Sequence, residues 1–108
     1  MSLERVIITV MSGADDGKVL TFEKTPITLG RDVNDNVCLP FDSRTSRHHA
    51  RITNEDGDFF IEDVGPTGEG STNGTYINEK RSKINGKTLI NSGDMILLGT
   101  VWIKFETK

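Results

Sequence analysis

Apolar and polar residues alternate along much of the chain with a period of two, which is the period of a β-strand. The segment 101–106, "VWIKFE", shows this clearly, since three apolar residues fall on one face and Trp102 and Lys104 on the other. Further alternating or β-branched apolar runs occupy 5–10, 18–23, 27–30, 48–53, 58–64 and 95–99. Each run predicts a strand.

Turn-forming sequences separate these runs, among them "SGADDG", "ING" and "NSGD". "NEDG" (54–57) lies between two of the runs and predicts a β-hairpin. We expect no helix: even in 41–56, the longest stretch without glycine or proline, apolar residues do not recur every three to four positions. Many short, closely spaced strands predict an all-β sandwich or barrel whose loops at one end carry the function.

The size and composition are those of one soluble globular domain. We predict a single domain over 1–108, with its core at about 5–106. No apolar run approaches the roughly 18 residues that span a membrane, and the first residues lack the basic start and cleavage site of a signal peptide. The only cysteine, Cys38, excludes an internal disulfide, so we expect the cytoplasm, or the nucleus if the source is a eukaryote.

The charge pattern favours a small anionic ligand. A net charge of −3 argues against a general binder of nucleic acid or of anionic membranes. Yet residues 43–54 carry three arginines and no acid, whereas residues 55–70 carry six acids and no base. A compact cationic patch on an acidic protein suits a small anion better than a long polyanion.

The adjacent histidines, His48 and His49, raise the question of a metal site or a catalytic pair. In a strand over 48–53 their side chains would point to opposite faces, and the chain has no third histidine, so we expect no metal site. Ser46 lies three residues before His49, but no G-x-S-x-G elbow is present and Arg47 stands beside the serine instead of a base. We therefore predict neither an enzyme nor a cofactor.

Donors for an oxyanion remain as the candidate chemistry, because guanidinium, hydroxyl and amide groups together suit phosphate oxygens. The candidate donors are Arg31, Ser46, Arg47, Thr72 and Asn73, all in predicted loops next to strands. The glycine-rich segment 68–75 lacks the lysine and the strand-then-helix setting of a P-loop, and Asn73-Gly74 also suits a tight turn. The joint occurrence of these donors predicts an anion-binding cradle.

Several motifs resemble those of the forkhead-associated (FHA) domain family. They are "LGR" (29–31), "SRHH" (46–49), "STNGTYIN" (71–78), "SGDMILLG" (92–99) and a final aromatic strand, and in this order they cover about 5–106. The resemblance implies a sandwich of two twisted, mainly antiparallel sheets with about eleven strands. It also implies binding of phosphothreonine in a partner protein, such as a Ser/Thr kinase or its substrate, without catalysis, nucleic acid or membrane.

The resemblance assigns roles to the donors. Arg31 matches an arginine that contacts the phosphate or the peptide backbone, and Ser46 a serine that hydrogen-bonds the phosphate. Arg47 occupies the next position, where a basic or amide side chain assists. Asn73 matches an asparagine that holds the peptide backbone, and Thr72 precedes it as a further contact.

Three more residues are expected to support this site. His49, not His48, matches the family histidine, whose implied role is to pin the loops by hydrogen bonds. Gly30 and Gly74 match positions with a backbone requirement. We assign no role to His48, which shares the strand parity of Ala50 and is expected at the rim, partly buried.

The chain departs from the family pattern between "DVG" (63–65) and "STNGT" (71–75), which the family usually joins directly. Here "PTGEG" (66–70) separates them. The insertion is either a passive bulge or an acidic gate, in which Glu69 pairs with an arginine of the site when no peptide is bound.

Two functions follow from these observations. The first is a phosphothreonine-dependent adaptor in Ser/Thr-kinase signalling. The second is an FHA-like scaffold that uses the same loops or a sheet face for contacts that ignore phosphorylation. Every expected ligand position is filled, which favours the adaptor.

Overall fold

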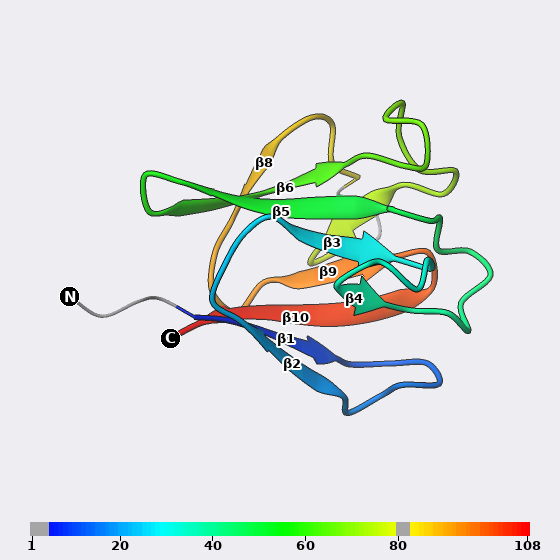
Figure 1. Cartoon of the computed structure of the whole chain (residues 1–108), viewed down its shortest axis with the longest axis horizontal. Coiled ribbons are helices and arrows are strands. Elements are labelled where there is room, and N and C mark those ends of the chain that lie inside the picture. Colours follow the sequence, from blue (N-terminus) through cyan, green and yellow to red (C-terminus); the bar gives the residue numbers. More distant parts are fainter. Residues whose placement is uncertain (1–4, 80–82) are drawn as a thin grey trace.

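Two five-stranded sheets pack face to face in the computed structural model, which describes residues 5–79 and 83–108 (Figure 1). Within these residues the strands are β1 (Val6–Val10), β2 (Val19–Phe22), β3 (Ile27–Gly30), β4 (Val37–Cys38), β5 (Ala50–Glu55), β6 (Asp58–Asp63), β7 (Thr75–Ile77), β8 (Thr88–Ile90), β9 (Met95–Leu98) and β10 (Val101–Thr107). The strand order is β2-β1-β10-β9-β7 in one sheet and β4-β3-β5-β6-β8 in the other. All pairs are antiparallel except β3 with β4. The fold is therefore the predicted β-sandwich.

The seven segments predicted as strands each contain one, and their bounds differ by at most two residues. The predicted hairpin at 54–57 joins β5 to β6 through Asp56 and Gly57. Both have positive φ, 55° and 92°, as a tight turn between twisted strands requires. Three strands of two or three residues, β4, β7 and β8, escaped prediction, because a run that short shows no period.

The geometry expected for the two histidines was wrong. Strand β5 begins at Ala50, and His48 precedes it with a left-handed backbone, φ 48°. Its side chain is 47% exposed and contacts Asp35, which agrees with the expected partly buried position. The cause is a contact distant in sequence: Asp35 accepts a hydrogen bond from the backbone N–H of His48, 3.0 Å, and so holds the chain in a turn.

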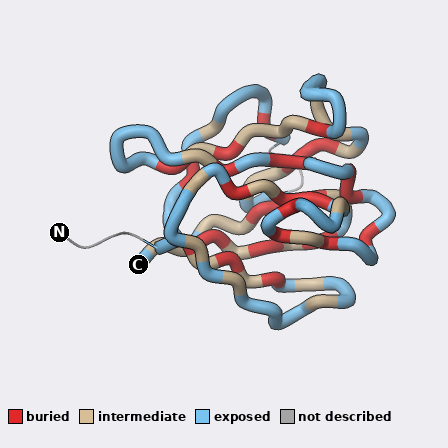
Figure 2. The backbone as a smooth tube through the Cα atoms, in the orientation of Figure 1, coloured by how far each residue is buried: buried red, intermediate tan, exposed pale blue. Residues whose placement is uncertain are grey.

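The core lies between the sheets and is built from the alternating residues of both (Figure 2). The side chains with no exposed area include Ile8, Ile27, Leu29, Ile52, Ile61, Ile96, Leu98, Ile103 and Phe105. Phe105 meets Phe59 of the opposite sheet edge to face, with 5.4 Å between ring centroids. Within the described residues no helix is long and apolar enough to cross a membrane.

The loops that follow β3, β4 and β6 gather at one end of the sandwich, away from the chain termini (Figure 1). The two sheets hold the ends of these loops in place because the strands on either side of each loop are anchored in the same core. This end of the sandwich is where the predicted anion-binding residues lie.

Truncation of the central aromatic residue tests the core. Phe105→Ala should lower the free energy of unfolding by about 3–5 kcal/mol, since it removes a fully buried ring and leaves a cavity. Leu89→Ala, at a half-exposed position of β8, is the matched control and should cost far less. Urea denaturation of both variants measures the difference, and equal losses would contradict this description of the core.

Candidate functional site

Hydrogen bonds join the three loops at this end of the sandwich. The N–H of Arg31 donates to the carbonyl of Ser46 at 3.1 Å. The N–H of Thr72 donates to Ser46 Oγ at 3.2 Å, and Asn73 Nδ2 donates to the carbonyl of Arg44 at 2.8 Å. The structure thus brings the candidate donors of three separate sequence segments into one cluster, with Arg47 next to Ser46 in the same loop.

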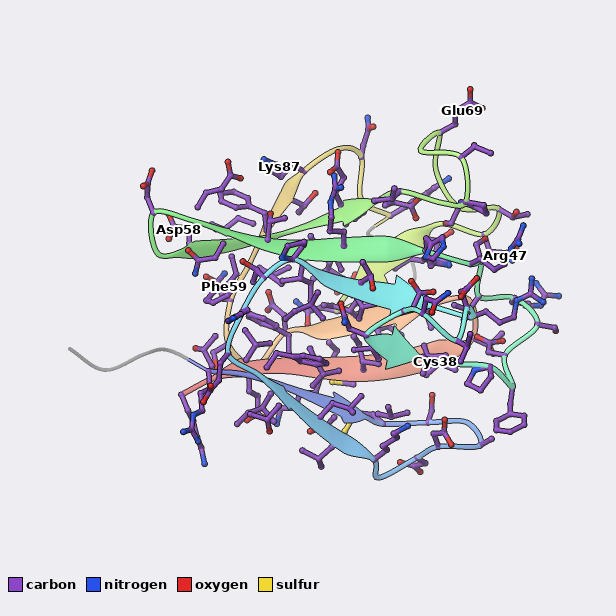
Figure 3. The ribbon with its side chains drawn as sticks, in the orientation of Figure 1. Cys38, Arg47, Asp58, Phe59, Glu69 and Lys87 are labelled. Carbon is purple, nitrogen blue, oxygen red and sulfur yellow. The ribbon has the colours of Figure 1, made fainter. Side chains whose placement is uncertain are left out.

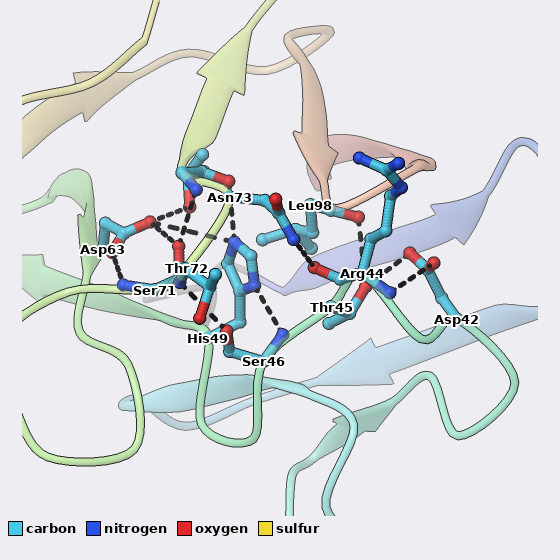
Figure 4. A network of polar contacts seen from close by, with 12 residues as sticks. Asp42, Arg44, Thr45, Ser46, His49, Asp63, Ser71, Thr72, Asn73 and Leu98 are labelled. Carbon is cyan, nitrogen blue, oxygen red and sulfur yellow. Dashed lines mark hydrogen bonds and ion pairs between the residues drawn. The ribbon is translucent and has the colours of Figure 1, made fainter.

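A buried imidazole lies at the centre of this cluster (Figure 4). His49 Nδ1 accepts the N–H of Ser46 at 3.0 Å, and Nε2 lies 2.8 Å from the carbonyl of Gly74. A carbonyl only accepts, so the proton is on Nε2 and the ring is neutral. Burial lowers the pKa of His49, although the Gly74 carbonyl and nearby Asp63 oppose this shift.

The bonds of His49 also bear on catalysis and metal binding. Both ring nitrogens of His49 are engaged with backbone groups, so neither is placed to take a proton from the hydroxyl of Ser46. Nδ1 of His48 lies 2.7 Å from Asp35 instead. Among the residues that the structure describes, no group of three histidine, cysteine or acidic side chains is arranged to hold a metal ion.

The carboxylate of Asp63 organises the loop before β7. It accepts hydrogen bonds from the N–H and the hydroxyl of Ser71, the latter at 2.6 Å, and from the hydroxyl of Thr75 at 2.7 Å. Ser71 Oγ in turn accepts the N–H of Gly74 at 2.9 Å. Burial alone would raise the pKa of Asp63, but the bonds from Ser71 and Thr75 outweigh it and hold the pKa below its usual value.

A second carboxylate, Asp42, ties the loop before β5 to the β9–β10 turn. It accepts the hydroxyl of Thr45 at 2.6 Å, the N–H and hydroxyl of Thr100 at 2.9 Å each, and the N–H of Arg44 at 3.1 Å. Burial opposes ionisation of Asp42, yet the hydrogen bonds from Thr45 and Thr100 prevail and lower its pKa. Asp42 was not among the residues predicted from the sequence, although an aspartate that accepts the backbone N–H two residues later is a common turn pattern.

The predicted glycines stand where a side chain would collide. A Cβ atom on Gly30 would lie 2.4 Å from Oδ2 of Asp35, which is the carboxylate that holds the turn at His48. Gly74 has φ 82°, and a Cβ there would lie 2.8 Å from the side chain of Lys83. A larger residue at Gly30 would therefore shift the backbone of the loop at His48 and His49, whereas at Gly74 the Lys83 side chain can move aside and the positive φ is the constraint.

Three arginines of these loops carry unneutralised charge. Arg31, Arg44 and Arg47 are exposed, and none forms an ion pair with an acid within residues 5–79 and 83–108. By contrast, Arg5 and Arg51 each pair with a glutamate, at 3.2 and 2.8 Å. The acidic side chains of these loops accept hydrogen bonds from backbone N–H and hydroxyl groups. The positive charge of the three arginines therefore remains available to bind an anion.

Hydrogen bonds close the insertion 66–70 at its base. The N–H of Gly70 donates to the carbonyl of Val64 at 2.7 Å, and the bonds from Ser71 to Asp63 close the base of the loop. Glu69 lies at the exposed tip and extends away from Arg47 (Figure 3). The described residues offer it no ion pair, so an acidic gate would need the loop to move and stays a prediction.

The bond pattern of His49 predicts how stability depends on pH. Its pKa is lower in the folded than in the unfolded chain, so unfolding takes up a proton once the pH falls below about 6.5. The free energy of unfolding should be constant above that pH and should decline below it. A second decline should begin near pH 4, because the pKa values of Asp42 and Asp63 are also lowered.

Urea denaturation from about pH 8 to pH 4 measures this dependence. His48→Gln is the control, because it leaves His49 as the only histidine of the chain. A stability that stays flat between about pH 7 and pH 5 in this variant would show that His49 is not the titrating group.

Comparisons with known proteins agree with the fold and the motifs. The sequence model of the FHA domain family matches residues 27–99. The FHA domain-containing protein FhaB of Mycobacterium tuberculosis is 29% identical over 99 residues, which cover 92% of this chain and 59% of FhaB.

Solved structures give the same answer. An FHA domain of a hypothetical Arabidopsis thaliana protein superposes with a TM-score of 0.82 at 25% identity, covering 94% of this chain and 84% of that one. The kinase-interacting FHA domain of the Arabidopsis kinase-associated protein phosphatase gives 0.76 at 25% identity, covering 97% and 94%. The chain belongs to the FHA domain family.

Proposed function

We propose that the chain binds a phosphothreonine-containing peptide with the loops that follow β3, β4 and β6. The observation that carries this proposal is the set of three exposed arginines without an acidic partner among the described residues, placed around Ser46 and Asn73. Guanidinium groups match the geometry and charge of a phosphate. Guanidinium groups held in a rigid cradle stabilise a bound phosphate more than neutral side chains in the same places would.

The hydrogen-bond pattern supports a role for each donor. The oxygen of Ser46 accepts from Thr72, which leaves the hydroxyl hydrogen to be donated to a phosphate oxygen. Arg31, whose N–H is bonded to the carbonyl of Ser46, and Arg47, which follows Ser46 in the chain, supply positive charge. Asn73 uses one N–H for the carbonyl of Arg44, so its oxygen and second N–H can reach the backbone of a peptide.

These contacts favour modest, switchable binding. A phosphothreonine carries about −1.5 to −2 charge at neutral pH, and each charge-assisted hydrogen bond contributes roughly 1.5–3 kcal/mol. Two or three such bonds, less the cost of ordering the peptide, leave about −8 kcal/mol, or micromolar affinity. An unphosphorylated peptide would leave the arginines without partners and should bind far more weakly.

The proposal extends to the partner and the setting. The kinase-interacting Arabidopsis relative supports a Ser/Thr kinase or a kinase substrate as the partner. We propose an adaptor role without catalysis, in the cytoplasm, for a single domain over 1–108. The chain spans about three fifths of FhaB, so the activity of a whole protein of that length also belongs to the proposal.

Binding of labelled peptides tests the function directly. Fluorescence anisotropy should show micromolar binding of a phosphothreonine peptide drawn from a library and much weaker binding of its phosphoserine and unmodified counterparts. Arg31→Ala and Ser46→Ala should each weaken binding by at least about tenfold, because each removes a charge-assisted hydrogen bond.

Arg5→Ala is the matched control, since Arg5 is exposed but directly precedes β1, where its N–H donates to the carbonyl of Lys108. It should bind like the unaltered protein, with unchanged thermal unfolding in all variants that are compared. Equal binding of phosphorylated and unmodified peptides would favour the phospho-independent scaffold. Loss of affinity in Arg5→Ala as large as in Arg31→Ala would point to a non-specific charge effect.

The acidic gate has its own test. If Glu69 closes over the arginines in the free protein, Glu69→Gln should tighten phosphopeptide binding, because the peptide no longer competes with a carboxylate. Asp58→Gln, which removes an exposed acid from the β5–β6 hairpin, is the control for a general gain of positive charge. Unchanged or weaker binding by Glu69→Gln would leave the insertion a passive bulge.

A further inference from the structure

A buried carboxylate, that of Asp35, ties together the two loops that carry Arg31 and Ser46. The side chain of Asp35 has no exposed area. Its Oδ2 accepts the N–H of Asp32 at 3.1 Å and the N–H of His48 at 3.0 Å, and its Oδ1 lies 2.7 Å from Nδ1 of the His48 ring. An ionised carboxylate only accepts, so Nδ1 of His48 carries a proton. One buried group thus fixes the backbone on both sides of the site.

The ring of His48 is the group that can supply positive charge to this carboxylate. Among residues 5–79 and 83–108, neither Asp35 nor Asp32 forms an ion pair with a lysine or an arginine. Nε2 of His48 lies 4.0 Å from Oδ2 of Asp32, and the ring is 47% exposed, so it can exchange a proton with solvent. A buried negative charge without a cation is costly. A second proton on the ring would place a cation between two carboxylates.

The other charged and titratable groups around His48 do not cancel this attraction. Arg31 and Arg47 oppose a further positive charge, but both are exposed and solvent screens them. Behind the loop, Cys38 Sγ lies 4.0 Å from the carbonyl of Arg31, and burial raises the pKa of this thiol, which keeps it uncharged near neutral pH. The next residue, His49, is held neutral by burial, which lowers its pKa. The short contact with Asp35 therefore dominates.

We propose that His48 is a positioning residue that links phosphopeptide affinity to pH. Its imidazolium form binds the carboxylate of Asp35 more strongly than the neutral ring does, and so fixes the loops that present Arg31 and Ser46. This proposal rests on the proposed function. A histidine changes its charge between about pH 5 and pH 8, and a charge-assisted hydrogen bond is about twice as strong as a neutral one. Because the proton favours the binding-competent loops, the affinity gains a contribution as the pH falls from about 8 to about 6.

Phosphopeptide binding at a series of pH values tests this link. The comparison variant is His48→Asn, because asparagine tolerates the left-handed backbone, φ 48°, and carries no charge. The phosphate itself loses charge near pH 6 in both proteins, so the informative quantity is the ratio of their affinities. This ratio, unaltered protein over His48→Asn, should rise roughly threefold to tenfold between about pH 8 and pH 6.

Two further variants separate the charge from the shape of the ring. His48→Lys keeps a cation at every pH of the series and should bind as well at pH 8 as at pH 7. Asp35→Asn removes the buried charge and should lose the pH-dependent gain. Its matched control is Asp58→Asn, an exposed acid at the opposite end of the molecule from Arg47, which should keep the gain (Figure 3). If Asp35→Asn does not fold, the two variants of His48 still decide the outcome.

Calorimetry in buffers of different ionisation enthalpy gives an independent readout. Near pH 7 the unaltered protein should take up a larger fraction of a proton on binding than His48→Asn, because tighter binding by the protonated form and proton uptake on binding are one coupling. A merely structural role would lower affinity equally at every pH and leave the uptake unchanged. A constant affinity ratio, or equal proton uptake, overturns the proposal while the proposed function stands. If no phosphothreonine peptide binds at any pH, both are overturned.

Discussion

A single neutral imidazole holds the loop end of this sandwich together. His49 joins the turn that contains Ser46 to the loop that contains Gly74, with one nitrogen accepting and the other donating. The ring satisfies both loops at once because it offers a donor at one end and an acceptor at the other, and it does so only while it is uncharged. Full burial enforces that state, since a charged ring would lose its hydration and would face the N–H of Ser46 as a second donor. The spacing of the loops, and thus of every candidate donor, depends on this bridge.

Apart from His49, carboxylates fix most of the loop conformation at this end of the sandwich. Their role explains how an acidic chain can offer a cationic site. Asp35, Asp42 and Asp63 each accept several hydrogen bonds from loop N–H and hydroxyl groups. These carboxylates make the loops rigid, and they do not pair with the arginines. The carboxylates therefore face backbone groups of the loops, whereas the guanidinium groups face solvent. The net charge of −3 then hides a local field of the opposite sign, which is the field that an anionic peptide meets.

The strands could be predicted and the loops could not, for a physical reason that particular residues show. The burial of Ile103 and Phe105 could be predicted from the alternation of apolar and polar residues, because successive side chains of a strand point to opposite faces of the sheet. His48 gave no such signal: its left-handed backbone is set by Asp35, 13 positions away. Asp42 reaches Thr100 across 58 positions, and no local pattern encodes that bond. The motif resemblance located the donors, but the carboxylates that position them became apparent only in three dimensions.

The hydrogen bonds of Asp63 also separate the five inserted residues from the site. Asp63 accepts hydrogen bonds from Ser71 on the far side of the insertion, and the N–H of Gly70 donates to the carbonyl of Val64, so the residues on either side of the insertion are tied together at the base of the loop. Closing a loop that is a few residues longer costs little free energy, because the entropy grows only with the logarithm of length. The tip is therefore mechanically independent of the cradle. From its extended position, Glu69 can act on the arginines only through its charge, and an effect of that kind weakens with salt, since the screening length is about 8 Å at physiological ionic strength. An effect that persists at high salt would require the loop to fold over and make direct contact.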